Sequence, residues 1–314
     1  MADGTTRLTS AVMPKTCLER TKGSNDMQER SQRWRDRRDG FVPNATTIDP
    51  AIHSVDVIDC YRDAKPFVQR HHYSGSFPAT RLSCGLFRNG AGGTSELVGV
   101  CSFAVPMNNA SIPLHTGLSG HLSAVDLGRL VLLDDVAGNG ESWFVSRAFR
   151  LLRREKPDIL SVIAYSDPVR RIASDGSVVM PGHCGMVYQA LSAQLRGRSS
   201  SRSDSIMPNG RIVSPRALSK IRSGDTGSAY AERQLVDAGA PPRLWGEDPQ
   251  EWVSRLKRSG HLNTRRHPGN LVYAFALTKA ARLAARGKPN HPYPLVDPTI
   301  VVGDVTTLPL MQAA

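Results

Sequence analysis

Aromatic side chains are scarce in this chain of 314 residues, where Phe, Trp and Tyr together make up 6%. Because 40% of the residues are nonetheless hydrophobic, the interior must be mostly aliphatic. A chain of this length and composition can bury one large core or two modest ones. The composition therefore predicts a globular protein.

Cysteines are few, odd in number, and never spaced as C-x-x-C. An unpaired set without that spacing argues against a disulfide framework and against a zinc ribbon. Reduced thiols fit the cytoplasm better than an oxidising compartment. The five residues are Cys17, Cys60, Cys84, Cys101 and Cys184.

Long apolar runs are also missing, and the N-terminus has no apolar segment like that of a secretory signal. We therefore expect a soluble, intracellular protein with no membrane partner.

Positive charge, in contrast, is abundant: the net charge is +12 and the pI is about 9.9. Residues 253–288 contain nine Lys or Arg and no acidic residue, and residues 196–222 contain seven basic residues and one acidic residue. Clustered positive charge indicates a polyanionic partner, most commonly nucleic acid. The candidates for phosphate contacts are Arg216, Lys220, Arg222, Arg265 and Arg266.

The chain divides into three parts by composition. Residues 1–54 are polar and basic, and we expect them to be weakly structured, either as an arginine-rich arm for nucleic acid or as a solvated tail. Residues 55–288 have the pattern of an α/β domain. Residues 289–314 are proline-rich, which predicts an irregular tail.

Within the α/β part, the hydrophobic pattern predicts a hairpin over 81–108 with its turn at 89–93, and buried strands over 123–136 and 158–168. Residues 141–157 have helical spacing, so strand, helix and strand form a crossover unit. We also predict a helix over 183–195, a Ser- and Arg-rich surface loop over 196–205, and a late helix over 271–289.

The link between strand 123–136 and the following helix contains Gly138, Gly140 and Ser142. Glycines permit tight turns, and the N–H groups of a helix start suit a phosphate. An ordinary strand–helix turn with no ligand is the competing interpretation.

Two other polar stretches stand at element ends. Asp167 follows a central strand, where it is either a general base or a turn residue before proline. His183, Cys184 and Tyr188 surround the start of a helix, where they form either a reactive site or a structural anchor.

His71 and His72 are adjacent, so in a strand they would point to opposite faces. This geometry argues against a metal site built from both, although one histidine could join Asp167 or His183 in a site made from distant segments.

Seven motifs in this order resemble the Mom family of bacteriophage DNA modification proteins, which is similar to the GNAT acyltransferase superfamily. The resemblance covers roughly residues 66–277. The motifs read RHHYSGSFPATRLSCGLF, LVGVCSFAVPMN, LGRLVLLDDV with SWFVSRAFRLLRRE, SVIAYSDP, GHCGMVYQA, NGRIVSPRALSKIRSG and HPGNLVYAFAL.

The resemblance implies a GNAT-like single domain at 55–288 with a mixed central sheet flanked by helices. It implies an enzyme of the host cell cytoplasm that converts adenine N6 in double-stranded DNA to a methylcarbamoyl (glycinamide) derivative, which protects phage DNA from restriction. It further implies acetyl-CoA or a related thioester, bound by Leu132, Gly138, Asn139, Gly140 and Ser142.

The resemblance also assigns a reaction centre to His72, Tyr73, Asp167 and Tyr188. Because plain acyl transfer does not supply the nitrogen of a glycinamide, a step with iron is conceivable, with His72, Asp167 and His183 as candidate ligands. The paired N6 of a duplex would have to be flipped out of the helix. The sequence leaves the oligomeric state unknown.

Three features depart from the family pattern. Asp135 stands where such acyltransferases carry Gln or Arg, and the segments between Asp167 and His183 and after Tyr188 are longer than usual. Two alternatives stay open at this point: an N-acyltransferase for a small amine or a protein, and a DNA-binding protein without activity.

Overall fold

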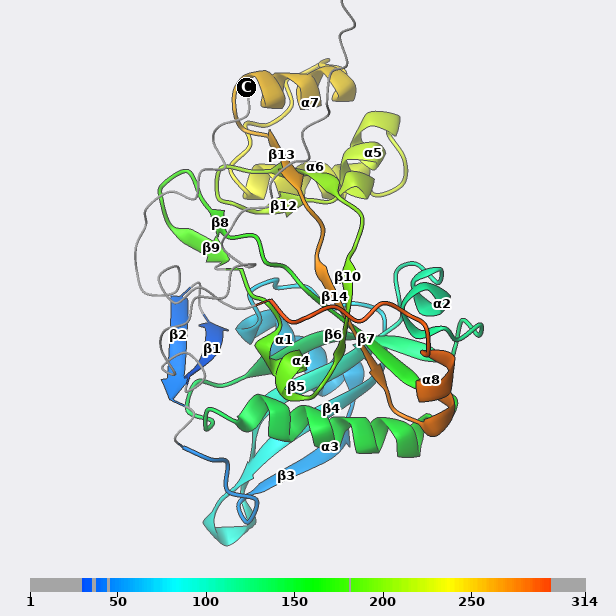
Figure 1. The fold of residues 1–314 in the computed structure, drawn as a ribbon. Coiled ribbons are helices and arrows are strands. Elements are labelled where there is room, and N and C mark those ends of the chain that lie inside the picture. Colours follow the sequence, from blue (N-terminus) through cyan, green and yellow to red (C-terminus); the bar gives the residue numbers. More distant parts are fainter. Residues whose placement is uncertain (1–29, 36–37, 44–45, 181, 295–314) are drawn as a thin grey trace, which may run out of the picture.

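A seven-stranded mixed sheet forms the centre of the molecule (Figure 1). The computed structural model describes residues 30–35, 38–43, 46–180 and 182–294. The strands lie in the order β10-β14-β7-β6-β5-β4-β3. Their bounds are β3 (His53–Ile58), β4 (Thr80–Asn89), β5 (Ser95–Ala104), β6 (Ala124–Leu132), β7 (Ser161–Ser166), β10 (Gln194–Arg198) and β14 (Leu271–Ala276).

Strands β6 and β7 are parallel, whereas every other neighbouring pair in this sheet is antiparallel. Helix α3 (Gly140–Glu155) connects them, which confirms the predicted strand–helix–strand crossover. The two strands pair only from Ala124 to Asp126 and from Ser161 to Ile163. Beyond these residues β6 and β7 separate, so the middle of the sheet contains a gap toward their C-terminal ends.

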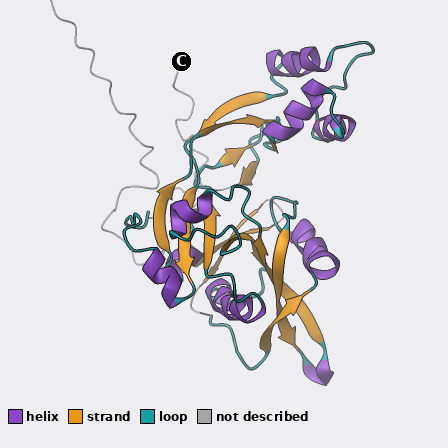
Figure 2. Cartoon of the chain, turned by 90° about the vertical axis from the view of Figure 1, so that its right-hand side faces the viewer, coloured by secondary structure: helices purple, strands orange, loops and turns teal. Residues whose placement is uncertain are grey.

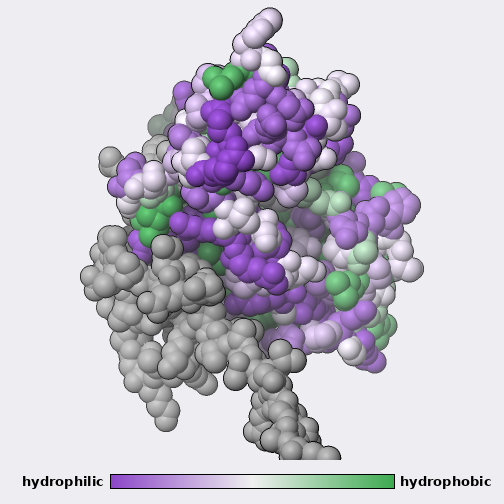
Figure 3. Space-filling view, turned by 90° about the horizontal axis from the view of Figure 1, so that it is seen from above, coloured by the Kyte–Doolittle hydropathy of each residue, from purple (hydrophilic) through white to green (hydrophobic). Residues whose placement is uncertain are grey.

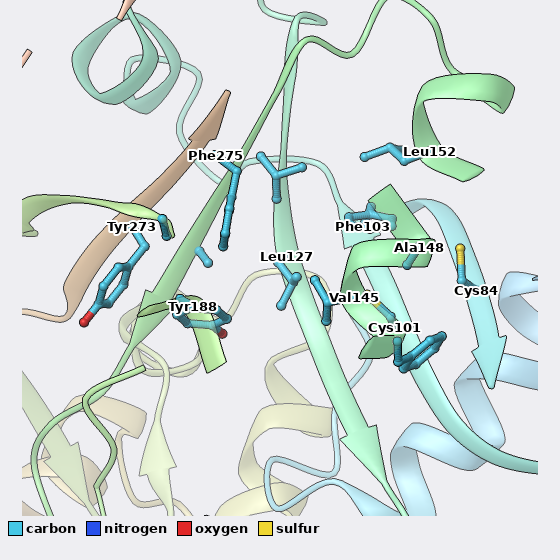
Figure 4. Close-up of a cluster of buried hydrophobic side chains, with 14 of the residues drawn as sticks. Cys84, Cys101, Phe103, Leu127, Val145, Ala148, Leu152, Tyr188, Tyr273 and Phe275 are labelled. Atoms are coloured by element: carbon cyan, nitrogen blue, oxygen red, sulfur yellow. The ribbon is translucent and has the colours of Figure 1, made fainter. Parts of the chain in front are cut away.

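One face of the sheet is covered by α3, which lies in front of it in Figure 1. Its buried side chains Phe144, Val145, Ala148 and Leu152 follow the helical spacing of an amphipathic helix. They pack into a large core with alternate residues of β4, β6, β7 and β14 (Figure 4).

The opposite face carries two short helices and one turn of π-helix, namely α1 (Lys65–His71), α2 (Ser111–Thr116) and η3 (Cys60–Ala64). A smaller cluster of Ala64, Val68, Val100 and Val131 joins α1 and η3 to the sheet. Successive residues of a strand point to opposite faces, which is why Val131 packs here while Leu132 packs against α3.

A second lobe lies between β10 and β14 in the sequence and stands above the large sheet in Figure 1. It has its own core around the fully buried Trp252, Ile221 and Leu256. The predicted domain of 55–288 thus contains a second large hydrophobic core besides the one between the sheet and α3. The elements of this lobe are β11 (Arg202–Ile206), β12 (Ile212–Val213), β13 (Asn263–His267), α5 (Pro215–Ser223), α6 (Ser228–Asp237) and α7 (Pro249–Arg258).

Two secondary-structure predictions are wrong. The late helix over 271–289 is instead the buried strand β14 followed by the short helix α8 (Lys279–Ala284), because a fully buried apolar run has no periodicity that separates strand from helix. The loop over 196–205 is instead the end of β10 and the start of β11. Its serines and arginines obscured the alternation of buried and exposed positions. The helix over 183–195 shortens to α4 (Met186–Ala190).

The remaining elements are small. Strands β1 (Arg30–Arg35) and β2 (Arg38–Pro43) pair within the stretch expected to be weakly structured. Strands β8 (Arg171–Ile172) and β9 (Val178–Met180) form a hairpin, and η4 (Ala91–Gly93) makes the predicted turn between β4 and β5. Within the described residues, no helix combines the length and apolar character needed to cross a membrane.

The expected class, a mixed sheet flanked by helices, is confirmed. Figure 2 shows the strands of the large sheet and the helical lobe from the side. The assignment of this fold to the GNAT superfamily stays a prediction.

The second core should collapse without its central tryptophan. Trp252 has no exposed surface, and its indole N–H donates to the Pro241 carbonyl at 3.0 Å. We expect Trp252→Ala to cost about 3–5 kcal/mol and to speed amide hydrogen exchange in α5, α6 and α7 while leaving β4 to β6 protected.

The matched control is Trp245→Ala in the same lobe, because Trp245 is fully exposed. It should change the free energy of unfolding by less than about 0.5 kcal/mol. Equal exchange rates in the Trp252→Ala and Trp245→Ala proteins would contradict the second core.

Candidate active site

A cavity of about 1090 Å³ occupies the gap where β6 and β7 separate. Its walls include Leu132 and Ser142 from the α3 side of the sheet, and Asp126, Arg129 and Tyr165 from the opposite side. The cavity therefore reaches both faces of the sheet through the gap, so two molecules could enter it from opposite sides.

The four residues predicted as a reaction centre all line this cavity. His72 and Tyr73 follow helix α1, Asp167 follows strand β7, and Tyr188 belongs to α4. The fold thus brings together three segments that are distant in sequence, as the prediction requires.

The His72 segment is a loop, and not a strand in which adjacent histidines would point to opposite faces. Helix α1 ends at His71, and His72 is its C-terminal cap. The His72 Nδ1 atom lies 2.9 Å from the Ser74 hydroxyl, and its ring stacks on Tyr73 at 4.3 Å between centroids. Burial, followed by the positive charge of Arg129, lowers the pKa of His72 to about 3, so this imidazole is neutral at physiological pH.

Arg129 is a residue that the sequence reasoning missed. Its guanidinium donates from Nε to the Ser76 carbonyl and from Nη2 to the Ser76 hydroxyl, both at 2.8 Å. These bonds hold the loop after His72 against strand β6. An arginine inside the predicted buried strand was the available signal, since a buried charge is normally paired or functional.

His267 is a second missed residue, and it contacts the predicted centre directly. Its Nε2 lies 2.9 Å from Oδ1 of Asp167, and both side chains are largely buried. The Gly269 N–H donates to His267 Nδ1 at 3.0 Å. Since Nδ1 accepts a hydrogen bond, Nε2 carries the proton and donates it to Asp167.

This arrangement keeps Asp167 ionised. Burial alone would raise its pKa, but hydrogen bonds from His267 and from the Val169 N–H to Oδ1 outweigh burial, so the pKa of Asp167 is lowered. Its second oxygen, Oδ2, has no hydrogen-bond partner among the described residues. A carboxylate held in this way is suited to orienting a donor group rather than to accepting a proton.

Tyr188 lies in the aromatic end of the main core, beside Tyr273 and Phe275 (Figure 4). It is 6% exposed, and burial raises the pKa of its phenol. A neutral phenol at the cavity wall can donate a proton. Gly185 has φ of +73°, and a Cβ there would lie 2.7 Å from the Tyr188 ring, so only glycine allows this approach.

The longer segment between Asp167 and His183 has its two ends joined by a backbone hydrogen bond. The His183 N–H donates to the Asp167 carbonyl at 2.8 Å. The hairpin of β8 and β9 then projects toward the second lobe, where the Ser174 N–H donates to the Pro208 carbonyl at 2.7 Å. The backbone hydrogen bond therefore holds Asp167 and His183 next to each other at the two ends of this segment.

Four of the five residues predicted to bind a cofactor line the cavity, namely Leu132, Gly138, Asn139 and Ser142. Gly140 is the first residue of α3 and is not part of the lining. The Ser142 hydroxyl donates to the Asn139 carbonyl, and the Asn139 side chain accepts from the Ile48 N–H.

The carboxylate of Asp135, which stands where such acyltransferases carry Gln or Arg, is paired with Arg88. Oδ2 of Asp135 lies 2.7 Å from Nη1 of Arg88, and Arg88 also binds Glu96 at 2.6 Å. Asp135 does not line the cavity, whereas Glu141 does. Its ion pair thus directs Asp135 toward the β4–β5 hairpin.

The candidate metal ligands His72, Asp167 and His183 all line the cavity. Across residues 30–35, 38–43, 46–180 and 182–294, however, no three His, Cys, Asp or Glu side chains are grouped so that they could hold a metal ion. Metal binding by these residues stays a hypothesis.

The five predicted phosphate-contacting residues all belong to the second lobe. Arg216, Lys220 and Arg222 are on α5, and Arg265 and Arg266 are on β13, immediately before His267. All are exposed except Lys220, which is half-buried. The described surface seen from the side of this lobe is largely hydrophilic (Figure 3).

Comparison with known proteins gives one family. A model of the Mom protein family matches residues 53–244, which is more than half of the chain. No curated protein matches the chain. The matched range includes His72, Tyr73, Asp167 and Tyr188, whereas His267 lies beyond it.

The hydrogen bond from His267 should set the acidity of Asp167. We expect His267→Ala to raise the pKa of the Asp167 carboxyl, because the donor that stabilises its ionised form is removed. Carbon-13 NMR of aspartate-labelled protein would follow this titration. His261→Ala, also in the second lobe, is the control and should leave the titration unchanged. An Asp167 pKa that is the same without His267 would rule out this role.

Proposed function

The chain belongs to the Mom protein family, and we propose that it converts adenine N6 in duplex DNA to a methylcarbamoyl derivative. Mom is a family of bacteriophage DNA-modifying proteins, so the chain is an enzyme whose substrate is DNA. The chemical identity of the added group and its protective effect against restriction belong to the proposal.

One observation carries this proposal. His72, Tyr73, Asp167 and Tyr188, which the family resemblance selects, line one cavity although they come from three distant segments. An unrelated acyltransferase for a small amine would have no use for a lobe that displays Arg216, Arg222, Arg265 and Arg266 to solvent, which favours DNA.

The mouth of the cavity suits a nucleobase that has left the helix. Tyr73, Val105, Met107 and Met186 line the cavity and are also exposed to solvent. Apolar and aromatic side chains at such a rim can stack on a flipped base, which must leave the duplex before its N6 atom can react. Adenine would thus enter beside Tyr73.

The side chains then have distinct roles in the proposal. Asp167, held ionised by His267, accepts a hydrogen bond that orients the substrate. Tyr188 stays a neutral phenol, because burial raises its pKa, and its O–H can donate a hydrogen bond to a leaving group. His72 is neutral and packs on Tyr73, so it positions that ring rather than supplying charge.

We propose the α3 side of the cavity as the place of a CoA thioester. Leu132, Gly138, Asn139 and Ser142 would hold it, with Gly140 beginning a helix of 16 residues whose N-terminal end favours a pyrophosphate. Arg88 directs the Asp135 carboxylate elsewhere, although Glu141 remains at the wall. When bound, such a thioester would supply an activated acyl carbon. A contribution from iron is a further hypothesis.

Plasmid DNA from bacteria that express this chain should contain a modified deoxyadenosine. Nucleoside mass spectrometry would detect it, and the mass would separate an acetyl from a glycinamide adduct. Asp167→Ala should reduce the adduct by about 100-fold or more, because an orienting group in the reaction centre is lost.

Asp158→Ala is the control, since Asp158 is exposed in the turn that precedes β7, at the opposite end of this strand from Asp167. A full adduct yield with Asp167→Ala would remove Asp167 from the reaction centre. Unmodified DNA with soluble intact protein would argue against DNA modification itself.

DNA affinity should depend on salt through the second lobe. The slope of log K against log salt is negative, and each lost phosphate contact makes it shallower by about 0.9. The double substitution Arg265→Ala with Arg266→Ala should therefore reduce its magnitude by about 2. Fluorescence anisotropy with a labelled duplex would measure this. Arg153→Ala, exposed on α3, should leave the slope unchanged; an equal decrease there would mean that the second lobe has no special role.

A further inference from the structure

A second carboxylate, Asp126 of β6, faces the same cavity as Asp167. Its neighbours Val125 and Leu127 pack on the α3 side of the sheet, so Asp126 points to the opposite face. Tyr165 and Asp167 share that face, because Ala164 between Ile163 and Tyr165 packs on the α3 side. This is the face that carries Tyr73 and the rim proposed to admit the base.

The position of Asp126 is unusual because it lies where β6 and β7 begin to separate. It is paired in register with Ile163, four residues before Asp167. At the rise of a β-strand, the two positions are about 13 Å apart along the sheet. Asp126 and Asp167 both line the cavity despite this separation. A bound nucleotide could therefore contact each carboxylate with a different part of its structure.

The two carboxylates have opposite environments. Oδ1 of Asp167 accepts two hydrogen bonds, from His267 and from the Val169 N–H. Oδ1 of Asp126 is buried and has no hydrogen-bond partner among the described residues. A buried acceptor without a partner is costly, and such a group is often retained because a ligand supplies the missing hydrogen bond.

From this geometry we propose that Asp126 is the general base of the reaction, taking a proton from the exocyclic amino group of the flipped adenine. The proposal rests on the proposed function and assigns to Asp126 the deprotonating role that Asp167 is poorly placed to perform. Asp167 remains the orienting carboxylate.

One N–H bond of the amino group breaks, and its electron pair remains on nitrogen. The nitrogen forms the new N–C bond with an electrophilic carbon of the donor co-substrate. The bond between that carbon and its leaving group breaks, and the leaving group departs with the bonding pair. The proton forms an O–H bond with Asp126, which later returns it to solvent through the cavity.

The acidity of Asp126 agrees with this role. Burial raises its pKa to about 7, and no charged side chain in the described residues changes that value. Ala104 of β5 is its partner in register, and the Tyr165 phenol of β7 is close enough that burial and then the charge of Asp126 raise the pKa of Tyr165. Two carboxyl groups with pKa values displaced in opposite directions are typical of a divided acid–base function.

Asp126→Asn tests the proposal because it keeps the shape of the side chain and removes the proton acceptor. In clarified extracts of expressing cells, which supply the small co-substrates, adduct formation on added plasmid should fall by about 100-fold or more. The intact protein should lose activity as the pH falls below about 7, and the residual activity of the variant should lack this limb. Asp126→Glu should restore part of the rate.

Duplex affinity should be the same in the intact and Asp126→Asn proteins, which separates a chemical role from a binding role. An unchanged rate and pH profile in Asp126→Asn would overturn the proposal while leaving DNA modification intact. If the intact protein produced no adduct, the proposed function would fail instead.

A measurement without turnover gives an independent check. Carbon-13 NMR should show a carboxyl resonance that titrates near pH 7 and is missing from Asp126→Asn. Because the folded pKa is raised above the unfolded value, Asp126 destabilises the protein as the pH rises from about 4 to about 7. Asp126→Asn should therefore raise the Tm at alkaline pH more than at acid pH, and a resonance that titrates near pH 4 would contradict the proposal.

Discussion

The hydrogen bond between His267 and Asp167 joins the two lobes at the cavity. It connects the end of β13 in the second lobe to the end of β7 in the large sheet. A buried carboxylate needs partners, and here the partner comes from an element formed 100 residues later in the chain. The second lobe must therefore be folded for His267 to hold the Asp167 carboxylate in its ionised form. The exposed arginines that precede His267 on β13 place the proposed DNA surface one residue away from this bond.

The separation of β6 and β7 is the second constraint. A sheet whose central strands stay paired would have no space between them, whereas three paired residues followed by divergence create a cavity that reaches both faces. Residues of one strand then serve two compartments, because alternate side chains point to opposite faces. Leu132 borders the compartment near α3, while Asp126 and Arg129 border the compartment near α1.

Much of the sheet could be predicted from the sequence, because local patterns determine it: the hairpin of β4 and β5, the crossover through α3 and the strand before Asp167 are all present. The late helix was wrong because Leu271 to Phe275 are all buried, which leaves no periodicity. The cavity lining of His72, Tyr73, Asp167 and Tyr188 followed from the family motifs. His267 and Arg129 were missed because their importance lies in partners, Asp167 and Ser76, that only the tertiary fold brings near.

The segment that contains the β8–β9 hairpin is coupled to the reaction centre. A backbone hydrogen bond joins its two ends at Asp167 and His183, and the Val169 N–H inside it donates to the Asp167 carboxylate. Farther along, the Ser174 N–H of the same hairpin donates to the Pro208 carbonyl of the second lobe. The segment is thus a second mechanical link, beside the hydrogen bond from His267, through which a movement of the second lobe would reach Asp167.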